Sequence, residues 1–206
     1  MILKNFIVLE GIDGAGTSTQ LDLLKNRLSP EKTVYTAEPT TLSTGRFLRS
    51  VLRGDEKLTP ETTAFLFAAD RQEHVYGSGG IVESCTSGKL VISDRYVFSS
   101  LAYQSITCGE ELPRKLNQDF PLPEYLFFFG ITPQASLKRI EKRDVTEIYE
   151  KKDFLEATAR QYEKIISYYE TLQTGMHIIR LDATESIEKL SEKIWTVLQE
   201  MPILQG

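Results

Sequence analysis

Short runs of apolar or β-branched residues recur along the chain and are separated by longer polar stretches. Each run has a charged or glycine residue directly beside it at one end or at both, and such short runs are typical of strands buried on both faces of a parallel sheet. Such runs lie at residues 6–9, 33–36, 89–93, 125–131 and 176–181. Because parallel strands are joined by crossover connections, helices are expected between them. The pattern predicts an α/β fold with a five-stranded parallel sheet and helices on both of its faces.

The stretches between these runs carry apolar residues at helical spacing. Leu21, Leu24 and Leu28 recur at intervals of three and four residues, so they share one face of a helix. A long helix begins at Thr59-Pro60, where threonine is the cap and proline takes the first helical position. The same reasoning predicts helices that start near Ser43 or Thr44 and at Thr132-Pro133, and helices over residues 153–172 and 186–199.

Two segments interrupt these patterns. Gly77-Ser78-Gly79-Gly80 ends or loosens the long helix, and the sequence leaves open whether a helix continues over residues 81–84. Residues 112–123 are polar and contain three prolines, so they are predicted to form a loop.

The charged segment from Asp144 to Lys152 has little apolar surface to bury. It is interpreted either as a lid that closes over a ligand or as a solvated helix connection. The chain shows no internal repeat and no linker rich in proline, glycine and serine. We therefore expect a single domain over residues 1–206, with the lid at about 141–153.

Composition narrows the classes of protein to which the chain can belong. Its length suits one α/β domain with a sizeable core, and its formal net charge of −5 gives no general attraction for nucleic acid. Any anionic ligand must therefore be held by a local cluster of arginines. The longest apolar run, residues 125–131, is far too short to span a bilayer. With no cleavable signal pattern, and with Cys85 and Cys108 in unrelated contexts, a cytoplasmic protein with reduced thiols is expected.

A glycine-rich turn joins the first predicted strand to the first predicted helix. Gly11-Ile12-Asp13-Gly14-Ala15-Gly16-Thr17-Ser18-Thr19 lets the backbone wind so that successive N–H groups point inward, and the helix N-terminus adds a positive partial charge. The spacing fits the phosphate-binding form G-x-x-x-x-G-K-[ST], except that Thr17 stands where the lysine belongs. Ser18 remains in place to ligate Mg²⁺. Without its lysine, the turn could also be only a tight strand-to-helix connection.

Further candidate contacts follow the second and third predicted strands. Arg46, Arg49 and Arg53 form one basic helical face, which is either solvated or a phosphate contact. Asp94 and Arg95 directly follow the third strand, at the sheet edge where ligands bind in α/β proteins. Asp94 can hold Mg²⁺ directly or through water, and Arg95 can fork onto a phosphate. The alternative is that these two residues form only a local ion pair.

The long helix carries a candidate base-binding pair. Phe67 and Arg71 lie one turn apart, so one can stack on a base while the other hydrogen-bonds to its edge or to a phosphate. The alternative is that Phe65, Leu66 and Phe67 pack in the core, which is expected of at least one of them. His74 is expected at the surface.

Four motifs together resemble the thymidylate kinase family, in the nucleoside monophosphate kinase branch of P-loop proteins. They are the glycine-rich turn with Gln20, Thr36-Ala37-Glu38-Pro39-Thr40, Phe67-Ala68-Ala69-Asp70-Arg71, and Asp94-Arg95-Tyr96-Val97-Phe98-Ser99-Ser100-Leu101-Ala102-Tyr103-Gln104. The last motif is the most specific, and the resemblance runs nearly from end to end. It implies a three-layer P-loop NTPase fold with a short lid, ATP- and Mg²⁺-dependent phosphorylation of dTMP to dTDP in dTTP biosynthesis, and a homodimer.

The resemblance also implies roles on the donor side of the site. The turn from Gly11 to Thr19 would wrap the phosphates of ATP, and Arg139 would lie near the adenine. A lid arginine, for which Arg143 is the candidate, would approach the transferred phosphoryl group. Arg95 would bridge the donor and acceptor phosphates.

On the acceptor side, the resemblance implies contacts with dTMP. Phe67 would stack on thymine, and Arg71 would bond its carbonyl edge. Ser100 and Gln104 would lie beside the base, and Tyr103 would crowd the sugar so that deoxyribose is preferred over ribose.

Three further residues would complete the acceptor side. Asp13 would contact the sugar hydroxyl, Glu38 would help to order the site, and Arg49 would reach the acceptor phosphate.

Three positions depart from the family pattern: Thr17 replaces the lysine, Ala37 an arginine and Gly130 an aspartate. Loss of one aimed donor typically costs about two to three decades in rate, whereas a well-placed arginine supplies about three to five decades. We therefore expect an active kinase in which Arg95 and the lid arginine cover the missing charge. The alternatives are a catalytically weakened nucleotide-binding regulator and a kinase for another deoxynucleotide or a nucleoside. No nucleic-acid or membrane partner is expected.

Overall fold

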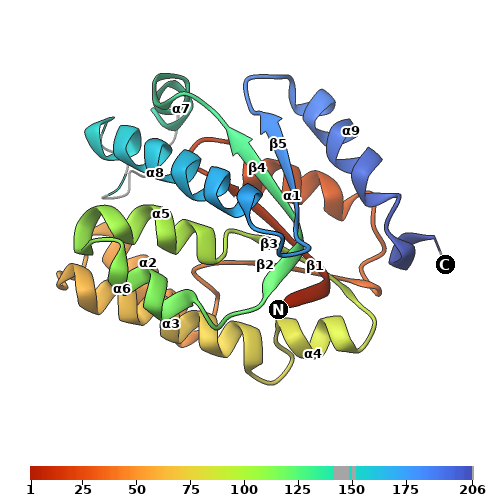
Figure 1. Ribbon diagram of the computed structural model, residues 1–206, viewed down its shortest axis with the longest axis horizontal. Coiled ribbons are helices and arrows are strands. Elements are labelled where there is room, and N and C mark those ends of the chain that lie inside the picture. Colours follow the sequence, from red (N-terminus) through yellow and green to blue (C-terminus); the bar gives the residue numbers. More distant parts are fainter. Residues whose placement is uncertain (142–148, 150–151, 206) are drawn as a thin grey trace.

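The computed structural model describes residues 1–141, 149 and 152–205. In this part of the chain, five strands form one parallel sheet in the order β2-β3-β1-β4-β5 (Figure 1). The strands are β1 (Ile2–Gly11), β2 (Thr33–Ala37), β3 (Leu90–Asp94), β4 (Leu122–Gly130) and β5 (His177–Asp182). The predicted α/β fold with a five-stranded parallel sheet is therefore confirmed, and each strand lies where an apolar run predicted it.

The central strand shows why the apolar runs are continuous. Successive side chains of a strand point to opposite faces of the sheet. In β1, Phe6 and Val8 enter the core on one face, and Ile7 and Leu9 enter the core on the other. All four are fully buried, because helices cover both faces.

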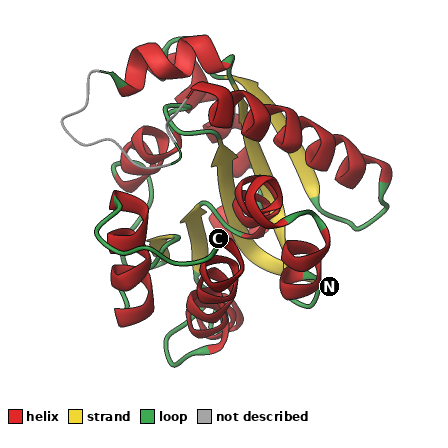
Figure 2. Cartoon of the chain, turned by 90° about the vertical axis from the view of Figure 1, so that its left-hand side faces the viewer, coloured by secondary structure: helices red, strands yellow, loops and turns green. Residues whose placement is uncertain are grey.

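Different helices build the two faces of the sheet. The helices α1 (Thr17–Lys25) and α9 (Ile187–Leu198) bury leucines and isoleucines against one face. The other face is covered by α4 (Ile81–Thr86), α5 (Val97–Cys108) and α8 (Lys152–Thr171). Figure 2 shows the strands enclosed between these helices.

The remaining helices lie outside these two layers. The helices α2 (Ser43–Arg53), α3 (Pro60–Tyr76) and α6 (Glu111–Asn117) pack together beside α5 (Figure 1). Helix α7 (Pro133–Ile140) follows β4, and a short 3₁₀ turn spans Pro202–Leu204. Within the residues described, no helix is long and apolar enough to cross a membrane.

Most of the predicted helix starts are confirmed. The hydroxyls of Thr59, Thr132 and Ser186 each accept a hydrogen bond from a backbone N–H in the first turn of α3, α7 and α9. The predicted cap of α2 is wrong, because Leu42 takes the cap position and no side chain of the described residues caps the helix. The Thr44 hydroxyl instead donates to the buried carboxylate of Asp70 at 2.6 Å.

Two irregular stretches also differ from the simplest reading of the sequence. Residues 112–123 were predicted as a loop, yet α6 occupies Glu111–Asn117. Pro113 is tolerated because it lies in the first turn, where its missing N–H would have no helical partner. The open question at residues 81–84 is settled by two separate helices, since α3 ends at Tyr76 and α4 begins at Ile81.

The order of the strands creates the crevice in which the site lies. The chain leaves β1 into α1 on one face of the sheet and leaves the neighbouring β3 into α5 on the opposite face. Connections that diverge in this way open a crevice outside the carboxyl ends of the two strands. Leu9 pairs with Asp94 in this register, so the glycine-rich turn after β1 and the Asp94-Arg95 pair after β3 flank the same crevice.

Candidate active site

The glycine-rich turn, residues 11–19, is the candidate phosphate-binding loop and is called the phosphate loop from here on. Gly14 and Gly16 have φ values of 78° and 100°, a left-handed region that glycine adopts without strain. A Cβ on Gly14 would lie 2.9 Å from the backbone oxygen of Ser136, so this glycine is also required by close packing. The loop ends in the N-terminus of α1 at Thr17, where unpaired N–H groups favour an anion.

Helix α7 supports the phosphate loop from outside. The Ser136 hydroxyl donates to the backbone oxygen of Asp13. Arg139 donates to the backbone oxygens of Gly14 at 3.2 Å and Ala183 at 2.7 Å. The bonds to Asp13 and Gly14 engage carbonyl groups of the loop, which favours a loop that presents its N–H groups to a ligand.

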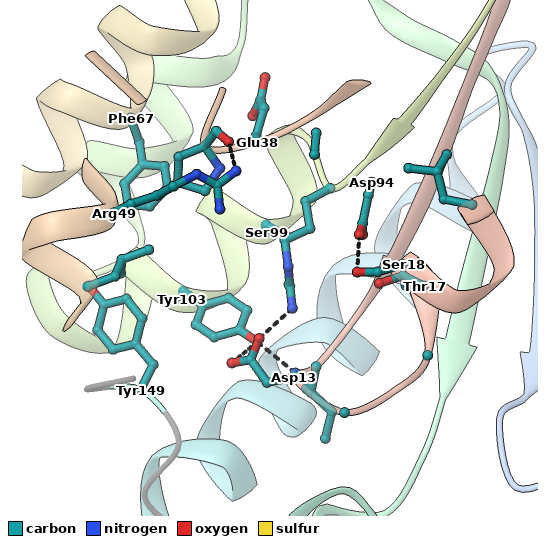
Figure 3. A pocket seen from close by; sticks show the side chains of 18 of the residues that line it. Asp13, Thr17, Ser18, Glu38, Arg49, Phe67, Asp94, Ser99, Tyr103 and Tyr149 are labelled. Carbon is teal, nitrogen blue, oxygen red and sulfur yellow. Dashed lines mark hydrogen bonds and ion pairs between the residues drawn. The ribbon is translucent and has the colours of Figure 1, made fainter. Parts of the chain in front are cut away.

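Ser18 and Asp94 provide a candidate cation site. The Ser18 hydroxyl donates to Asp94 Oδ2 at 2.5 Å (Figure 3). Asp94 Oδ1 is buried and has no hydrogen-bond partner within residues 1–141, 149 and 152–205. An oxygen that is buried and unpaired beside a hydroxyl fits Mg²⁺, which prefers oxygen ligands. Among the described residues no cluster of three or more His, Cys, Asp or Glu could hold a metal. Further ligands would therefore have to come from phosphates and water.

Thr17 occupies the position of the motif's lysine. It is the first residue of α1, lines the cavity, and is only 6 % exposed. Figure 3 shows it beside Ser18, on the same side of the cavity as Asp94. A hydroxyl at this point can donate one hydrogen bond, but it brings no positive charge.

Arg95 lies at the centre of the crevice, in contact with the phosphate loop. Its φ of 72° is unusual for a non-glycine residue. Nη2 donates to Asp13 Oδ1 at 2.6 Å, and Nη1 donates to the backbone oxygen of Gly11 at 2.9 Å. Burial by itself would lower the pKa of this guanidinium, but the oxygens of Tyr103 and Asp13 raise it well above its ordinary value. Arg95 is therefore a permanent cation held against the loop.

Tyr103 joins α5 to the phosphate loop. Its hydroxyl donates to Asp13 Oδ2 at 3.0 Å and accepts from the Asp13 N–H at 3.1 Å. The Arg95 guanidinium lies 5.4 Å from the centre of the ring. Burial raises the pKa of the Tyr103 hydroxyl well above its ordinary value, so the hydroxyl keeps its proton. The ring and the Asp13 carboxylate therefore form a fixed floor to this part of the cavity.

A buried ionic cluster orders the opposite side of the cavity. Arg71 is 1 % exposed and donates to Glu38 Oε2 from Nε at 2.9 Å and from Nη2 at 2.5 Å. His74 Nδ1 lies 3.0 Å from Glu38 Oε1, and its Nε2 lies 2.6 Å from the Thr36 hydroxyl. The prediction that His74 is a surface residue is wrong, because it is 8 % exposed and binds the Glu38 carboxylate.

Two residues from other elements complete the surroundings of Arg71. Its Nη1 donates to the Asn117 side chain at the end of α6, and its Nη2 donates to the Ser100 hydroxyl at 3.0 Å. With the two bonds to Glu38, four of its five N–H groups are used by described residues. The unpredicted helix α6 thus contributes directly to the site.

One cavity of about 520 Å³ joins these parts. It is lined by most of the phosphate loop and by residues from the other motifs, namely Glu38, Arg49, Phe67, Arg71, Asp94, Arg95, Tyr103 and Gln104. Figure 3 shows Phe67 and Arg49 across the cavity from Ser18 and Asp94. Phe67 is only partly buried and Phe65 is exposed, so neither ring belongs to the core.

Some predicted residues lie behind or beside the cavity rather than in its wall. Gly11 and Ala15 are buried within the turn, and Ser100 lies under Arg71. Arg139 is exposed and contacts the phosphate loop from outside the cavity. Arg143 lies outside the described residues, as does most of the predicted lid.

Glu10 is a charged residue of the site that the sequence did not single out. It is fully buried at the end of β1 and accepts from the backbone N–H of Tyr96 at 2.8 Å and from the Ser99 hydroxyl at 2.7 Å. The Tyr162 hydroxyl of α8 donates to the same carboxylate at 2.8 Å. Burial raises the pKa of Glu10 to about 7, although the nearby Arg95 guanidinium opposes the shift. The only signal in the sequence was an acidic residue that directly follows an apolar run.

Tyr149 is a second residue that the sequence did not single out. It lines the cavity, and its ring stacks on Phe154 with 4.7 Å between the ring centres. The Tyr103 ring lies 5.7 Å away. An aromatic residue in a charged segment was the available signal.

Comparison with known proteins gives a consistent result. The model of the family described as thymidylate kinase matches residues 9–194. A provisionally named thymidylate kinase of Treponema pallidum (strain Nichols) is 42 % identical over 97 % of this chain and 97 % of its own length. A thymidylate kinase of Leptospira interrogans serovar copenhageni is 34 % identical over 91 % of this chain and 90 % of its own.

Proposed function

The chain belongs to the thymidylate kinase family, and from this premise we propose which of its residues perform the reaction. It is an ATP-dependent nucleoside monophosphate kinase that phosphorylates dTMP, a step in the synthesis of dTTP. The observation that carries the proposal is a single cavity lined both by the phosphate loop and by Phe67 and Arg71, with Arg95 bonded to the loop. Donor and acceptor nucleotides can meet at that arginine.

The phosphate loop binds the triphosphate of ATP. Its N–H groups and the N-terminus of α1 attract the phosphates, and the Ser18 hydroxyl and Asp94 hold Mg²⁺. The ion supplies neutralisation of phosphate charge when it is bound. Arg139, which contacts the outer side of the loop, lies near the adenine.

Transfer takes place beside Arg95. An oxygen of the dTMP phosphate forms a bond with the terminal phosphorus of ATP, while the bond from that phosphorus to the bridging oxygen breaks and ADP leaves. Negative charge spreads over the transferred group, so an oriented guanidinium stabilises the transition state more than the ground state. Arg49 holds the acceptor phosphate from the other side, and Arg143 of the lid is the candidate for a second catalytic arginine.

Arg95 compensates for the lysine that the motif would have at position 17. Thr17 leaves room and one hydroxyl where the lysine would stand, and Arg95 supplies the positive charge. An arginine that contacts the transferred group supplies about three to five decades of rate, which exceeds the usual loss of one aimed donor.

Gln104 and Arg71 explain a preference for thymine. Gln104 Oε1 is buried and has no partner among the described residues, so it favours a ligand that donates a hydrogen bond. Arg71 retains one N–H on Nη1 for a carbonyl oxygen, and Phe67 offers a face for stacking. Thymine has both a ring N–H and adjacent carbonyls, whereas the corresponding ring nitrogen of cytosine is an acceptor.

Tyr103 and Asp13 select the sugar. The hydroxyl of Tyr103 is locked on the Asp13 carboxylate, so the ring cannot move aside for an additional 2′-hydroxyl. Asp13 offers an acceptor to the sugar 3′-hydroxyl. Glu38 acts indirectly, because it holds Arg71 in place.

A coupled assay of ADP release tests the proposal. Wild-type protein with ATP and Mg²⁺ is tested with dTMP, dUMP, dCMP, dGMP and thymidine. We expect turnover with dTMP, weaker turnover with dUMP, and little with the others. Nucleotide binding without ADP release would instead support a regulator, and preference for dCMP or thymidine would indicate a kinase for another acceptor.

We further propose a homodimer of single-domain protomers in the cytoplasm. Phe47 on α2 and Phe65 on the adjacent α3 are exposed apolar residues that a second copy would cover. The described thiols of Cys85 and Cys108 are free, which fits a reducing compartment. Sedimentation of wild-type protein and of Phe65→Asp tests the dimer, which the variant should weaken.

A further inference from the structure

Glu10 lies directly behind Arg95, and two hydroxyl groups connect them. Arg95 Nη1 donates to the Ser99 hydroxyl oxygen at 3.1 Å and lies 3.5 Å from the Tyr162 hydroxyl oxygen. Both hydroxyls in turn donate to Glu10 Oε2, at 2.7 Å and 2.8 Å. Above a pH of about 7, where Glu10 is ionised, the carboxylate and the guanidinium therefore form an ion pair that is bridged by hydroxyls rather than by direct contact.

The donors and acceptors in this bridge agree in direction. Each hydroxyl has one hydrogen, and the two hydroxyl oxygens lie 2.8 Å apart as well as within hydrogen-bond distance of Glu10 Oε2. An ionised Glu10 can only accept, so it is fully served when both hydroxyls donate to it rather than to each other. The lone pairs of Ser99 and Tyr162 are then available to Arg95, which can only donate. A chain of hydrogen bonds with one direction polarises its members and fixes the orientation of the terminal guanidinium.

Glu10 also fixes the backbone from which Arg95 projects. Its Oε1 accepts from the backbone N–H groups of Tyr96 at 2.8 Å and Ser99 at 3.2 Å, at the start of α5. Arg95 precedes this point and has a φ of 72°, so its unusual conformation is held by bonds on the next residues. One carboxylate thus constrains both the main chain and the side chain of Arg95.

We propose that Glu10 is a positioning residue for phosphoryl transfer, which orients the Arg95 guanidinium through the hydroxyls of Ser99 and Tyr162. The inference rests on the proposed function, in which Arg95 contacts the transferred phosphoryl group. Glu10 itself is fully buried and does not line the cavity. Its effect must therefore appear in the rate of transfer and must depend on the presence of Arg95.

Glu124 supplies a matched control. It is also a buried carboxylate, and it accepts from Lys4 Nζ and from the Asn5 N–H, each at 2.8 Å. It lies near the start of β4, at the end of the sheet away from the phosphate loop. A purely structural role for Glu10 would make Glu10→Gln and Glu124→Gln behave alike.

The experiment combines Glu10→Gln and Arg95→Ala in a double-mutant cycle, with thermal unfolding as a check on folding. The glutamine keeps the size of the side chain and the acceptor for both N–H groups, and at pH 8, above the Glu10 pKa of about 7, it removes the charge. The kinetics are therefore measured at pH 8. We expect Glu10→Gln to lower kcat with ATP and dTMP by about 10- to 100-fold, because misplacement of a reacting group costs up to that factor. KM for either nucleotide should change by less than about threefold.

The effect of Glu10→Gln in the Arg95→Ala variant distinguishes a residue that positions Arg95 from one that only stabilises the fold. In Arg95→Ala, we expect Glu10→Gln to lower kcat by less than about twofold, since coupled residues are not additive. Ser99→Ala and Tyr162→Phe leave Glu10 in place and cut the bridge, so each should reproduce part of the loss in kcat even if Glu10→Gln folds poorly.

Two outcomes would overturn the inference while leaving the proposed function intact. The first is an equal effect of Glu10→Gln on kcat with and without Arg95. The second is a kcat close to that of wild type in Glu10→Gln or in both bridge variants. Failure of wild-type protein itself to release ADP with dTMP would instead reject the proposed function.

Discussion

The two walls of the cavity are built to bind anions in different ways. The phosphate loop relies on backbone N–H groups and on the N-terminus of α1, and its Thr17 adds no charge. The rest of the lining, called the arginine wall, relies on guanidinium groups. Arg71 is paired with Glu38 on the side opposite the loop, and Arg95, between the two sides, is paired with Asp13 of the loop. The shape of the phosphate loop therefore depends on glycine conformations, whereas the arginine wall depends on buried ion pairs.

The difference indicates how the tasks of the site are divided. Backbone dipoles hold an anion wherever the loop keeps its shape, because they cannot rotate away or lose a proton. Guanidinium groups bring full charges, but each needs a partner that orients it in the free enzyme. We therefore expect changes in the loop to affect ATP binding and changes on the arginine wall to affect transfer.

The largest effect is expected for Arg95→Ala. Loss of the central guanidinium should lower kcat by about three decades or more, as for other arginines that act on a transferred phosphoryl group. Steady-state kinetics with ATP and dTMP measures the change. Arg180→Ala is the control, because Arg180 pairs with Glu163 and Glu170 on the surface and should leave kcat unchanged. Equal rates for Arg95→Ala and wild type would remove the distinction between the walls.

The second prediction concerns how the stability of the folded protein changes with pH because Glu10 is buried behind Arg95. The folded protein raises the pKa of Glu10 from 4.5 to about 7 through burial, so folding binds its proton more tightly. The protonated Glu10 stabilises the folded state fully below pH 4.5, and this contribution is lost as the pH rises through about 7. From pH 5 to 8, the free energy of unfolding of wild type should fall by about 2–3 kcal/mol relative to Glu10→Gln.

Urea unfolding of both proteins at each pH provides this measurement. The comparison with Glu10→Gln cancels the titration of groups that the two proteins share. A difference in stability that stays constant from pH 5 to 8, or that changes in the opposite direction, would contradict the prediction.

A third prediction addresses the shape of the phosphate loop. Gly14→Ala should weaken ATP binding by about 10- to 100-fold, because the left-handed φ and contact with Ser136 force the loop to move. Binding of dTMP should change far less. Gly130→Ala is the matched control, since its Cβ would have only an ordinary contact at 3.6 Å. Calorimetric titration measures both ligands, and equal loss of ATP and dTMP binding would contradict the division of tasks.

The smallest effect is expected for Thr17→Lys. The new ammonium would reach the phosphates from the first residue of α1 and tighten ATP binding by about tenfold, the order expected of a charged hydrogen bond. Thr86→Lys adds the same charge on α4, at an exposed position outside the cavity, and should leave binding unchanged. Abolished binding in Thr17→Lys would mean that the loop has been rebuilt around threonine.

The positions that the sequence predicted and the structure confirms are local in the chain. The phosphate loop follows from glycine spacing between an apolar run and a helical pattern, and Asp94-Arg95 follows from its place after a buried strand. Caps such as Thr59 also depend on neighbouring residues alone. In each case the signal and the structure span fewer than about a dozen residues, the range over which periodicity is informative.

The features that were missed depend on contacts between distant segments. Glu10 acquires its role from Tyr162, 152 positions away, and His74 is buried because Glu38, 36 positions away, folds over it. Helix α6 belongs to the site through the contact between Asn117 and Arg71, which are far apart in the chain. No periodicity of hydrophobic residues encodes such pairs, because they arise from the order of the strands.

The most direct test of the account is a single-turnover measurement on wild-type protein, with enzyme in excess over dTMP and with saturating ATP and Mg²⁺. We predict conversion of dTMP to dTDP at about 1–100 s⁻¹, the ordinary range for kinases, without a lysine at position 17. Binding of both nucleotides with no formation of dTDP, or formation only after Thr17→Lys, would contradict the claim that the arginine wall supplies the charge.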